Sequence, residues 1–144
     1  MTRLYGWALG GQRLFARAPG GHWSTTTMIA ALRISGPTAP MVIRGPVDTE
    51  VFRAYTNQVL VPTLQPGNIV VLDNLSSHKA PDIRQSIEQA GAELWYLPPY
   101  SPDFNPIEQM WSKVKTYLCK AAARTEETLY DAIAKALTTV TTQD

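Results

Sequence analysis

The stretch Ile69-Val70-Val71-Leu72-Asp73 indicates the fold class of this 144-residue chain. Four apolar residues in a row, three of them β-branched, predict a short strand, and a continuous apolar run is typical of a strand buried on both faces. A carboxylate follows directly at the carboxyl end of that strand, where α/β sheets place their ligands. We therefore expect the strand to lie at the centre of a sheet and to present Asp73 at its end.

Apolar spacing and turn residues on both sides of this run predict the other elements. In chain order they are a strand hairpin at 23–34 and 39–43 turning at 35–37, helices at 48–60 and 81–90, a strand at 93–97, and helices from 106 and 125. One or two short strands are also expected around the Gly10-Gly11 turn. Antiparallel strands followed by alternating strands and helices predict one α/β domain over 1–144, with a mixed sheet and helices on its faces.

The composition excludes several classes of protein. Hydrophobic residues make up 44% of the chain and the net charge is +1, which is ordinary for a globular domain. The sequence shows neither a signal peptide nor a membrane span, so we expect no membrane partner. The single cysteine, Cys119, fits a reducing cytoplasm, and with two histidines it is too little for a typical structural zinc site.

Asp73 has two interpretations that its position alone does not separate. It can be a functional carboxylate at a strand end. Alternatively, Asp73 and Asn74 can cap the turn after the strand, because short polar side chains satisfy nearby backbone groups.

Glu108 also has two interpretations. Asn105, Pro106 and Glu108 resemble a capping box, in which the glutamate returns to the amide of the cap residue. At 100° per residue, however, Glu108 lies at the edge of the apolar stripe of its helix, and Lys115 lies on the same edge two turns later. A carboxylate for metal and a lysine for phosphate on one edge would suit a nucleic-acid active site.

Basic residues near these acids are candidates for contact with nucleic acid. His78 and Lys79 follow Asp73, and they either approach a phosphate or make loop hydrogen bonds ahead of the helix that begins at Pro81. Lys113, Lys115, Lys120 and Arg124 form a second cluster. A sparse run of this kind is more often a solvated face, so the charge pattern by itself does not establish DNA binding.

Two segments together resemble the mariner-type DDE transposases, and specifically their bacterial insertion-sequence-630 branch. One is Val70-Val71-Leu72-Asp73-Asn74-Leu75-Ser76-Ser77-His78-Lys79. The other is Leu97-Pro98-Pro99-Tyr100-Ser101-Pro102-Asp103-Phe104-Asn105-Pro106-Ile107-Glu108, followed by Trp111 and Lys115. The 34 residues between Asp73 and Glu108 match the spacing between the second and third acids of that family.

The resemblance implies a ribonuclease-H-like fold and DNA transposition by metal-dependent strand cleavage and strand transfer. It places the second and third metal-binding acids at Asp73 and Glu108, which with a further acid would hold two Mg²⁺ or Mn²⁺ ions. The implied active-site loop consists of Asn74, Pro99, Tyr100, Ser101, Pro102, Asn105 and Pro106. The implied partners are transposon ends and target DNA, with a homodimer as the complete enzyme, in the bacterial cytoplasm at the nucleoid.

The first acid of the family has no counterpart at the expected place. It would lie on an opening strand just before Met1, and Asp48 and Glu50 do not fit that position. We therefore expect an N-terminally truncated catalytic domain, inactive by itself, whose partner is an upstream-encoded half. The alternatives are a non-catalytic nucleic-acid-binding remnant and, less in keeping with the segment that ends in Glu108, an unrelated metal-dependent phosphatase or nuclease.

Overall fold

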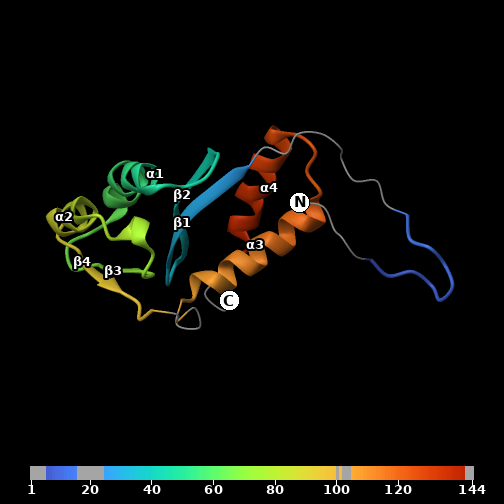
Figure 1. Ribbon diagram of the computed structural model, residues 1–144, viewed down its shortest axis with the longest axis horizontal. Coiled ribbons are helices and arrows are strands. Elements are labelled where there is room, and N and C mark those ends of the chain that lie inside the picture. The colour runs from blue at the N-terminus through green and yellow to red at the C-terminus, as the bar shows by residue number, and fades with distance from the viewer. Residues whose placement is uncertain (1–5, 16–24, 100, 102–104, 142–144) are drawn as a thin grey trace. The chain divides into compact units, whose positions relative to one another are not determined.

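The chain divides into two units in the computed structural model, which describes residues 6–15, 25–99, 101 and 105–141 (Figure 1). Unit 1 is Met1–Trp23 with Gln109–Asp144, and unit 2 is Ser24–Glu108. None of the described helices is long and apolar enough to cross a membrane.

Unit 2 begins with the predicted hairpin, formed by β1 (Thr26–Arg33) and β2 (Gly36–Arg44). The strands are antiparallel, and Arg33 is paired with Gly36. That pairing leaves only residues 34 and 35 for the turn. The turn expected at 35–37 therefore lies about one residue too late in the chain. Pro37 lies inside β2, where its missing N–H is tolerated because β2 has one described neighbour and is an edge strand.

The predicted helix at 48–60 exists, but it changes type along its length. Asp48 caps α1 (Thr49–Tyr55) by accepting a hydrogen bond from the Val51 amide at 2.8 Å. The chain then continues as the π-helix η1 (Thr56–Leu60) and the 3-10 turn η2 (Val61–Thr63). The buried Thr56 hydroxyl donates to the Phe52 carbonyl at 2.9 Å. It therefore competes with the backbone amide that would bind this carbonyl in a regular α-helix, at the point where the α-helix becomes a π-helix.

A parallel β-α-β unit follows. Its parts are β3 (Ile69–Leu72), the 3-10 turn η3 (Ser76–His78), α2 (Pro81–Gln89) and β4 (Glu93–Tyr96). Ile69 is paired with Glu93, and Leu72 with Tyr96. Gly91 ends the helical segment at a φ of 80°, and a Cβ added there would lie 3.2 Å from Pro66, so both the conformation and the close approach favour glycine.

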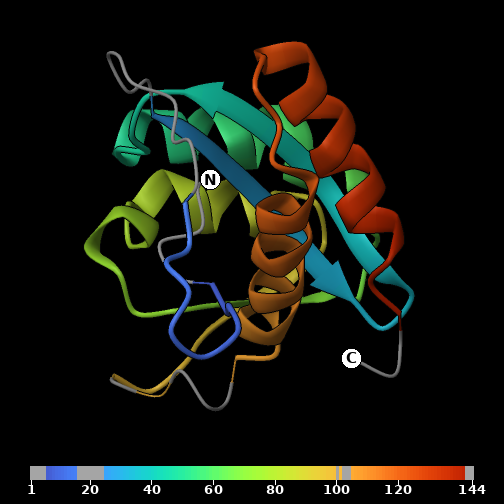
Figure 2. The same ribbon diagram turned by 90° about the vertical axis from the view of Figure 1, so that its right-hand side faces the viewer.

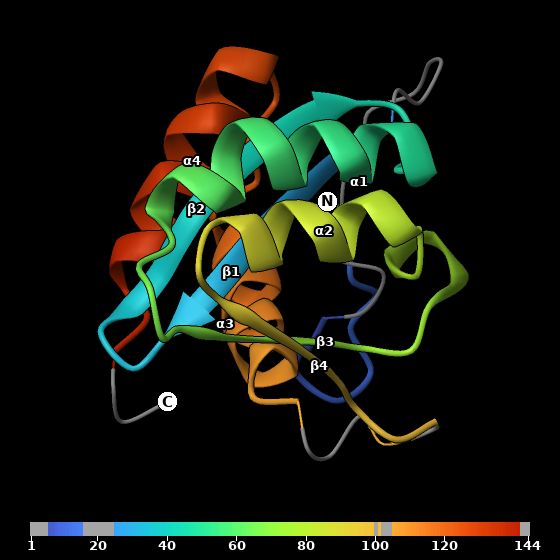
Figure 3. The ribbon, with the colours of Figure 1, turned by 90° about the vertical axis from the view of Figure 1, so that its left-hand side faces the viewer.

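The expectation of one mixed sheet with β3 at its centre is wrong for the described residues. The strands form two separate two-stranded sheets, β1-β2 and β3-β4 (Figure 3). No described strand lies between them to pair with both, so β1 and β3 each keep one edge without a strand partner. Ile69 and Val71 are about half exposed, at 51% and 52%, so the expected burial of β3 on both faces is also wrong.

The hydrophobic core of unit 2 lies between one face of the two sheets and the helices α1, η1 and α2. Figure 3 shows α1 and α2 side by side over the strands. Residues on the helical faces are the most deeply buried, with Ile87 and Ile83 at 0% and 1% exposure. Val70, Leu72 and Tyr96, on the inner face of the β3-β4 pair, pack against this core.

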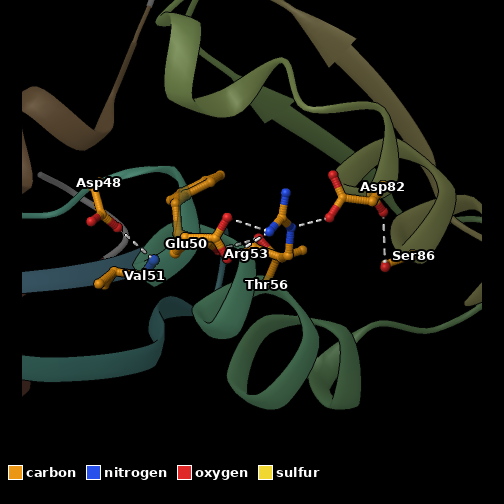
Figure 4. A network of polar contacts seen from close by, with 8 residues as sticks. Asp48, Glu50, Val51, Arg53, Thr56, Asp82 and Ser86 are labelled. Carbon is orange, nitrogen blue, oxygen red and sulfur yellow. Dashed lines mark hydrogen bonds and ion pairs between the residues drawn. The ribbon is translucent and has the colours of Figure 1, made fainter.

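An ion network joins α1 to α2 (Figure 4). The Arg53 guanidinium contacts Glu50 at 2.6 Å within α1 and also contacts Asp82 in the first turn of α2. All three side chains are at least one-third exposed, so solvent screens the charges and the network contributes little to the free energy of unfolding.

Unit 1 contains most of α3 (Ile107–Ala121) and all of α4 (Glu126–Thr138). Thr125 caps α4 as predicted, through reciprocal hydrogen bonds with Thr128. The two helices lie side by side (Figure 2), with a hollow lined by residues from both. Met110, Val114, Ala132, Ile133 and Ala136 are their buried residues, which confirms the amphipathic pattern.

The strands expected in the first 20 residues are not found where the structure describes them. Residues 6–15 contain no strand. The Gly10-Gly11 turn is present, with the Gln12 amide donating to the Leu9 carbonyl at 2.9 Å. Trp7 and Phe15 are exposed, so these aromatic residues have no packing contact of the kind that would hold a strand in place. The remaining residues of that stretch lie outside the described part.

Tyr55 offers a test of the core. It is 2% exposed, and its hydroxyl has no hydrogen-bond partner among the described residues. Burial raises the pKa of this hydroxyl from 10.0 to about 12. The hydroxyl therefore loses its proton at a lower pH in the unfolded chain than in the folded one. The free energy of unfolding falls as the pH rises from about 10 to about 12, by at most about 2–3 kcal/mol.

We expect Tyr55→Phe to leave stability unchanged at neutral pH, or to raise it by up to about 1 kcal/mol, because the hydroxyl is buried unpaired. Above pH 10 the advantage of the variant should grow, because phenylalanine has no proton to lose. Urea unfolding of both proteins at pH 7 and pH 11 measures this. An equal difference at both pH values would contradict the assignment.

Candidate active site

One cleft of about 380 Å³ in unit 2 collects residues from the two segments that the sequence singles out. It is formed where β3 ends, where β4 ends and where α3 begins. Its lining residues are Asp73, Asn74, Leu75, Leu97, Pro98, Pro99, Ser101, Asn105 and Glu108. Both predicted acids therefore face one cavity, although 34 residues separate them along the chain.

Asp73 caps the turn after β3 and also lines the cleft. Its Oδ1 atom accepts a hydrogen bond from the Leu75 amide at 3.2 Å, so the carboxylate does cap the turn after β3. The same oxygen lies 2.6 Å from Nδ1 of His78. Within the described part of the chain no donor contacts Oδ2, and the side chain is 43% exposed. One oxygen thus holds the loop and the other remains available to a ligand.

Glu108 lies in the first turn of α3 and is exposed. Its amide donates to the Asn105 carbonyl at 3.1 Å, which begins the helix. The capping-box alternative would require the Glu108 carboxylate to return to Asn105, and none of the described residues donates a hydrogen bond to that carboxylate. Glu108 is therefore free to bind a ligand in the cleft, near a helix N-terminus that favours negative charge.

The predicted active-site loop is brought together in part. Asn74, Pro99, Ser101 and Asn105 line the cleft, and Pro106 does not. Tyr100 and Pro102 lie outside the described residues. The sequence reasoning did not single out the apolar wall formed by Leu75, Leu97 and Pro98. No local sequence signal marks this wall, because it depends on the pairing of β3 with β4: the Leu97 amide donates to the Leu72 carbonyl at 2.8 Å, which sets the β4 exit beside Asp73.

The predicted basic residues fall into two groups. His78 and Lys79 belong to unit 2, where Lys79 is exposed and the His78 side chain is only 16% exposed. Neither lines the cleft. Lys115, Lys120 and Arg124 are exposed residues of unit 1, and Lys113 is half-buried there.

The donor chemistry of the cleft suits a hard divalent cation. Two carboxylates, each with an oxygen free of partners within the described residues, are the ligands that Mg²⁺ and Mn²⁺ prefer. No group of three or more acidic, histidine or cysteine side chains suited to a metal occurs in the described ranges. The cleft therefore offers two carboxylates that could hold such a cation, those of Asp73 and Glu108.

Over residues 1–130 the sequence matches the family described as DDE superfamily endonuclease. The chain belongs to that family. No sequence among the curated proteins is similar enough to this chain to count as a relative.

The fold of this DDE endonuclease family member is shared with solved Mos1 transposase complexes and with a viral intasome. The crystal structure of the Mos1 strand transfer complex matches with a TM-score of 0.54 at 21% identity, over 95% of this chain and 47% of that one. A pre-cleavage Mos1 transpososome matches with a TM-score of 0.54 at 19% identity, over 94% and 48%. The simian T-cell lymphotropic virus intasome in complex with a PP2A regulatory subunit gives 0.52 at 11% identity, over 76% and 45%.

The mixed α/β class is therefore confirmed, and the fold is shared with part of the Mos1 chains. The chain spans about half the length of the Mos1 chains it matches.

Proposed function

We propose that this chain carries part of a DNA transposase catalytic centre, in which Asp73 and Glu108 are ligands of two divalent metal ions. The observation that carries the proposal is the placement of both carboxylates on one cleft, each with an oxygen that no described residue occupies. The family match and the shared fold support a phosphoryl-transfer role on DNA. A Mos1 mariner paired-end complex contains Mn, which supports Mg²⁺ or Mn²⁺ as the cofactor.

Bound ions of this kind would activate a water or a DNA 3′-hydroxyl and stabilise the departing oxygen. The protein's part is to hold the acids rigidly. Asp73 is fixed at a strand end through its contacts on Oδ1, and Glu108 is fixed in the first turn of a helix. Leu75, Leu97 and Pro98 form an apolar wall on one side of the cleft.

The proposed partners are transposon ends and target DNA, with a homodimer as the complete enzyme. The related Mos1 structures include a transposase paired-end complex with the left transposon end. We propose Lys79, Lys113, Lys115, Lys120 and Arg124 as phosphate contacts. From the sequence resemblance we also propose the bacterial insertion-sequence-630 branch and a place at the nucleoid.

The first acid is proposed to lie on a strand outside the given sequence. Asp48 caps α1 and Glu50 is paired with Arg53, and neither of them lines the cleft that Asp73 and Glu108 share. The separate sheets β1-β2 and β3-β4 each keep an open edge, and one added strand could pair with both. Such a strand would join the two pairs into the mixed sheet expected from the sequence, and it would come from an upstream-encoded segment.

The test compares this chain with a form extended upstream through the family's first strand. Both are incubated with supercoiled plasmid in Mg²⁺ or Mn²⁺, and nicked product is measured by gel electrophoresis. Nicking by the extended form only supports the proposal. If neither form nicks DNA but both bind it, the second candidate gains support. That candidate is a non-catalytic nucleic-acid-binding remnant, which the lack of a three-ligand group among the described residues favours.

We expect this chain to bind DNA weakly and without sequence preference, with an affinity that falls steeply as salt rises. If roughly three to four of the basic residues contact phosphates, raising the salt from 50 to 200 mM should weaken binding about 100-fold. Fluorescence anisotropy titrations measure this. Lys115→Ala should reduce the slope of log K against log salt by about 1, and Lys135→Ala on α4 is the matched control. Strong selectivity for one sequence would contradict the expectation.

A further inference from the structure

His78 is held in place through both its side chain and its backbone. Its imidazole ring stacks on the Phe52 ring, with centroids 4.0 Å apart and planes inclined by 29°. Its backbone carbonyl accepts a hydrogen bond from the Tyr96 hydroxyl at 2.9 Å. Phe52 and Tyr96 both belong to the packed core region of unit 2, so the ring and its backbone are fixed from two elements.

The polar side of this ring meets Asp73. Nδ1 of His78 lies 2.6 Å from Oδ1 of Asp73, a close polar contact that is not an aligned hydrogen bond. The Leu75 amide reaches the same oxygen at 3.2 Å. Both contacts therefore fall on one oxygen of the carboxylate. Asp73 lines the cleft and His78 does not, so the histidine lies on the protein side of the aspartate.

We propose that His78 is a positioning residue for Asp73, which it holds so that Oδ2 faces the cleft. The inference rests on the proposed metal role of Asp73. A carboxylate that is 43% exposed would otherwise sample other rotamers, and each rotamer would move the ligand oxygen. The contact between the His78 ring and Oδ1 limits the rotamers that Asp73 can adopt before a cation binds. Residues that contact a metal ligand commonly orient it in this way.

This role replaces the DNA contact that the sequence predicts for His78. A ring that is 16% exposed, with one face against Phe52 and Nδ1 turned to Asp73, has little surface for a phosphate. Lys79, the next residue, is exposed and better suited to that contact.

The experiment uses Mn²⁺ binding by the chain, measured by isothermal titration calorimetry and by the electron paramagnetic resonance signal of free Mn²⁺. His78→Leu removes the polar nitrogen that lies beside Oδ1 of Asp73, whereas His78→Asn keeps a polar group at that end of the side chain. We expect His78→Leu to weaken Mn²⁺ binding about 10- to 100-fold, and His78→Asn to recover much of the loss. In an Asp73→Asn background the same His78 changes should have no further effect, because the histidine acts through the aspartate.

The outcomes separate this inference from the proposed function. If Asp73→Asn leaves Mn²⁺ affinity unchanged, the metal site itself is wrong and the inference falls with it. If Asp73→Asn weakens binding and His78→Leu does not, only the inference is overturned, even where His78→Leu lowers stability in urea. A loss of DNA affinity by His78→Leu in metal-free buffer would also overturn it, in favour of a phosphate contact.

A second readout needs no metal. The carboxyl ¹³C resonance of Asp73 in nuclear magnetic resonance spectra reports the contacts of that carboxylate. We expect it to shift in His78→Leu and to move back toward the wild-type position in His78→Asn. If the protein binds too little Mn²⁺ to measure, the chemical shift of this carboxyl carbon is the test of the inference. An unchanged chemical shift in His78→Leu overturns the inference.

Discussion

Asp73→Asn and Glu108→Gln are each expected to lower metal-dependent DNA nicking by at least about 10³-fold in the form extended through the family's first strand. Each change keeps the size of the side chain and removes one negative ligand from the cleft. Because positioned charge is most of what a two-metal site contributes, the loss should appear in the rate with intact DNA binding. Single-turnover nicking of a supercoiled plasmid measures it.

The matched control is Glu88→Gln. Glu88 pairs with Arg84 at 3.0 Å on the exposed face of α2 and does not line the cleft, so its loss should change the rate less than about twofold. A Glu88→Gln effect as large as that of Glu108→Gln would mean that net charge, and not the cleft, controls the reaction.

The chain by itself is expected not to nick DNA in Mg²⁺, because two carboxylates cannot fix both ions and the distance between them. Magnesium-dependent nicking by the unextended chain that requires Asp73 would show that the first acid lies within this sequence. Asp48 would then be the next residue to replace.

Ile87→Ala is expected to lower the free energy of unfolding by about 3–4 kcal/mol. Ile87 lies on α2, is 0% exposed and belongs to the core between that helix and the inner face of the sheets. The change therefore removes buried methyl groups and leaves a cavity. Urea or thermal unfolding monitored by circular dichroism measures the loss, which is large beside the 5–15 kcal/mol that stabilises most domains.

Ile34→Ala is the matched control, because Ile34 is 94% exposed in the hairpin turn. It should change stability by less than about 0.5 kcal/mol. Equal losses for the two variants would mean that the helices α1 and α2 do not close over the strands as described.

The sequence determined the elements whose causes are local. Asp48 and Thr125 begin helices because their side-chain oxygens accept the first free amides, and Gly91 ends one because glycine adopts a positive φ at low cost. The sequence also singles out Asp73, which follows a strand end, and Glu108, which lies in the first turn of a helix, and both line the cleft.

The tertiary structure decided what depends on neighbours. An apolar run does not show how many strands pair with it, so Ile69 and Val71 were expected to be buried and are half exposed. The cleft exists because the pairing of β3 with β4 brings residues 73–75 beside residues 97–99, across more than twenty positions of sequence. The contact of His78 with Asp73 depends on a ring stacked on Phe52 from a different helix, and sequence periodicity carries no information about such a contact.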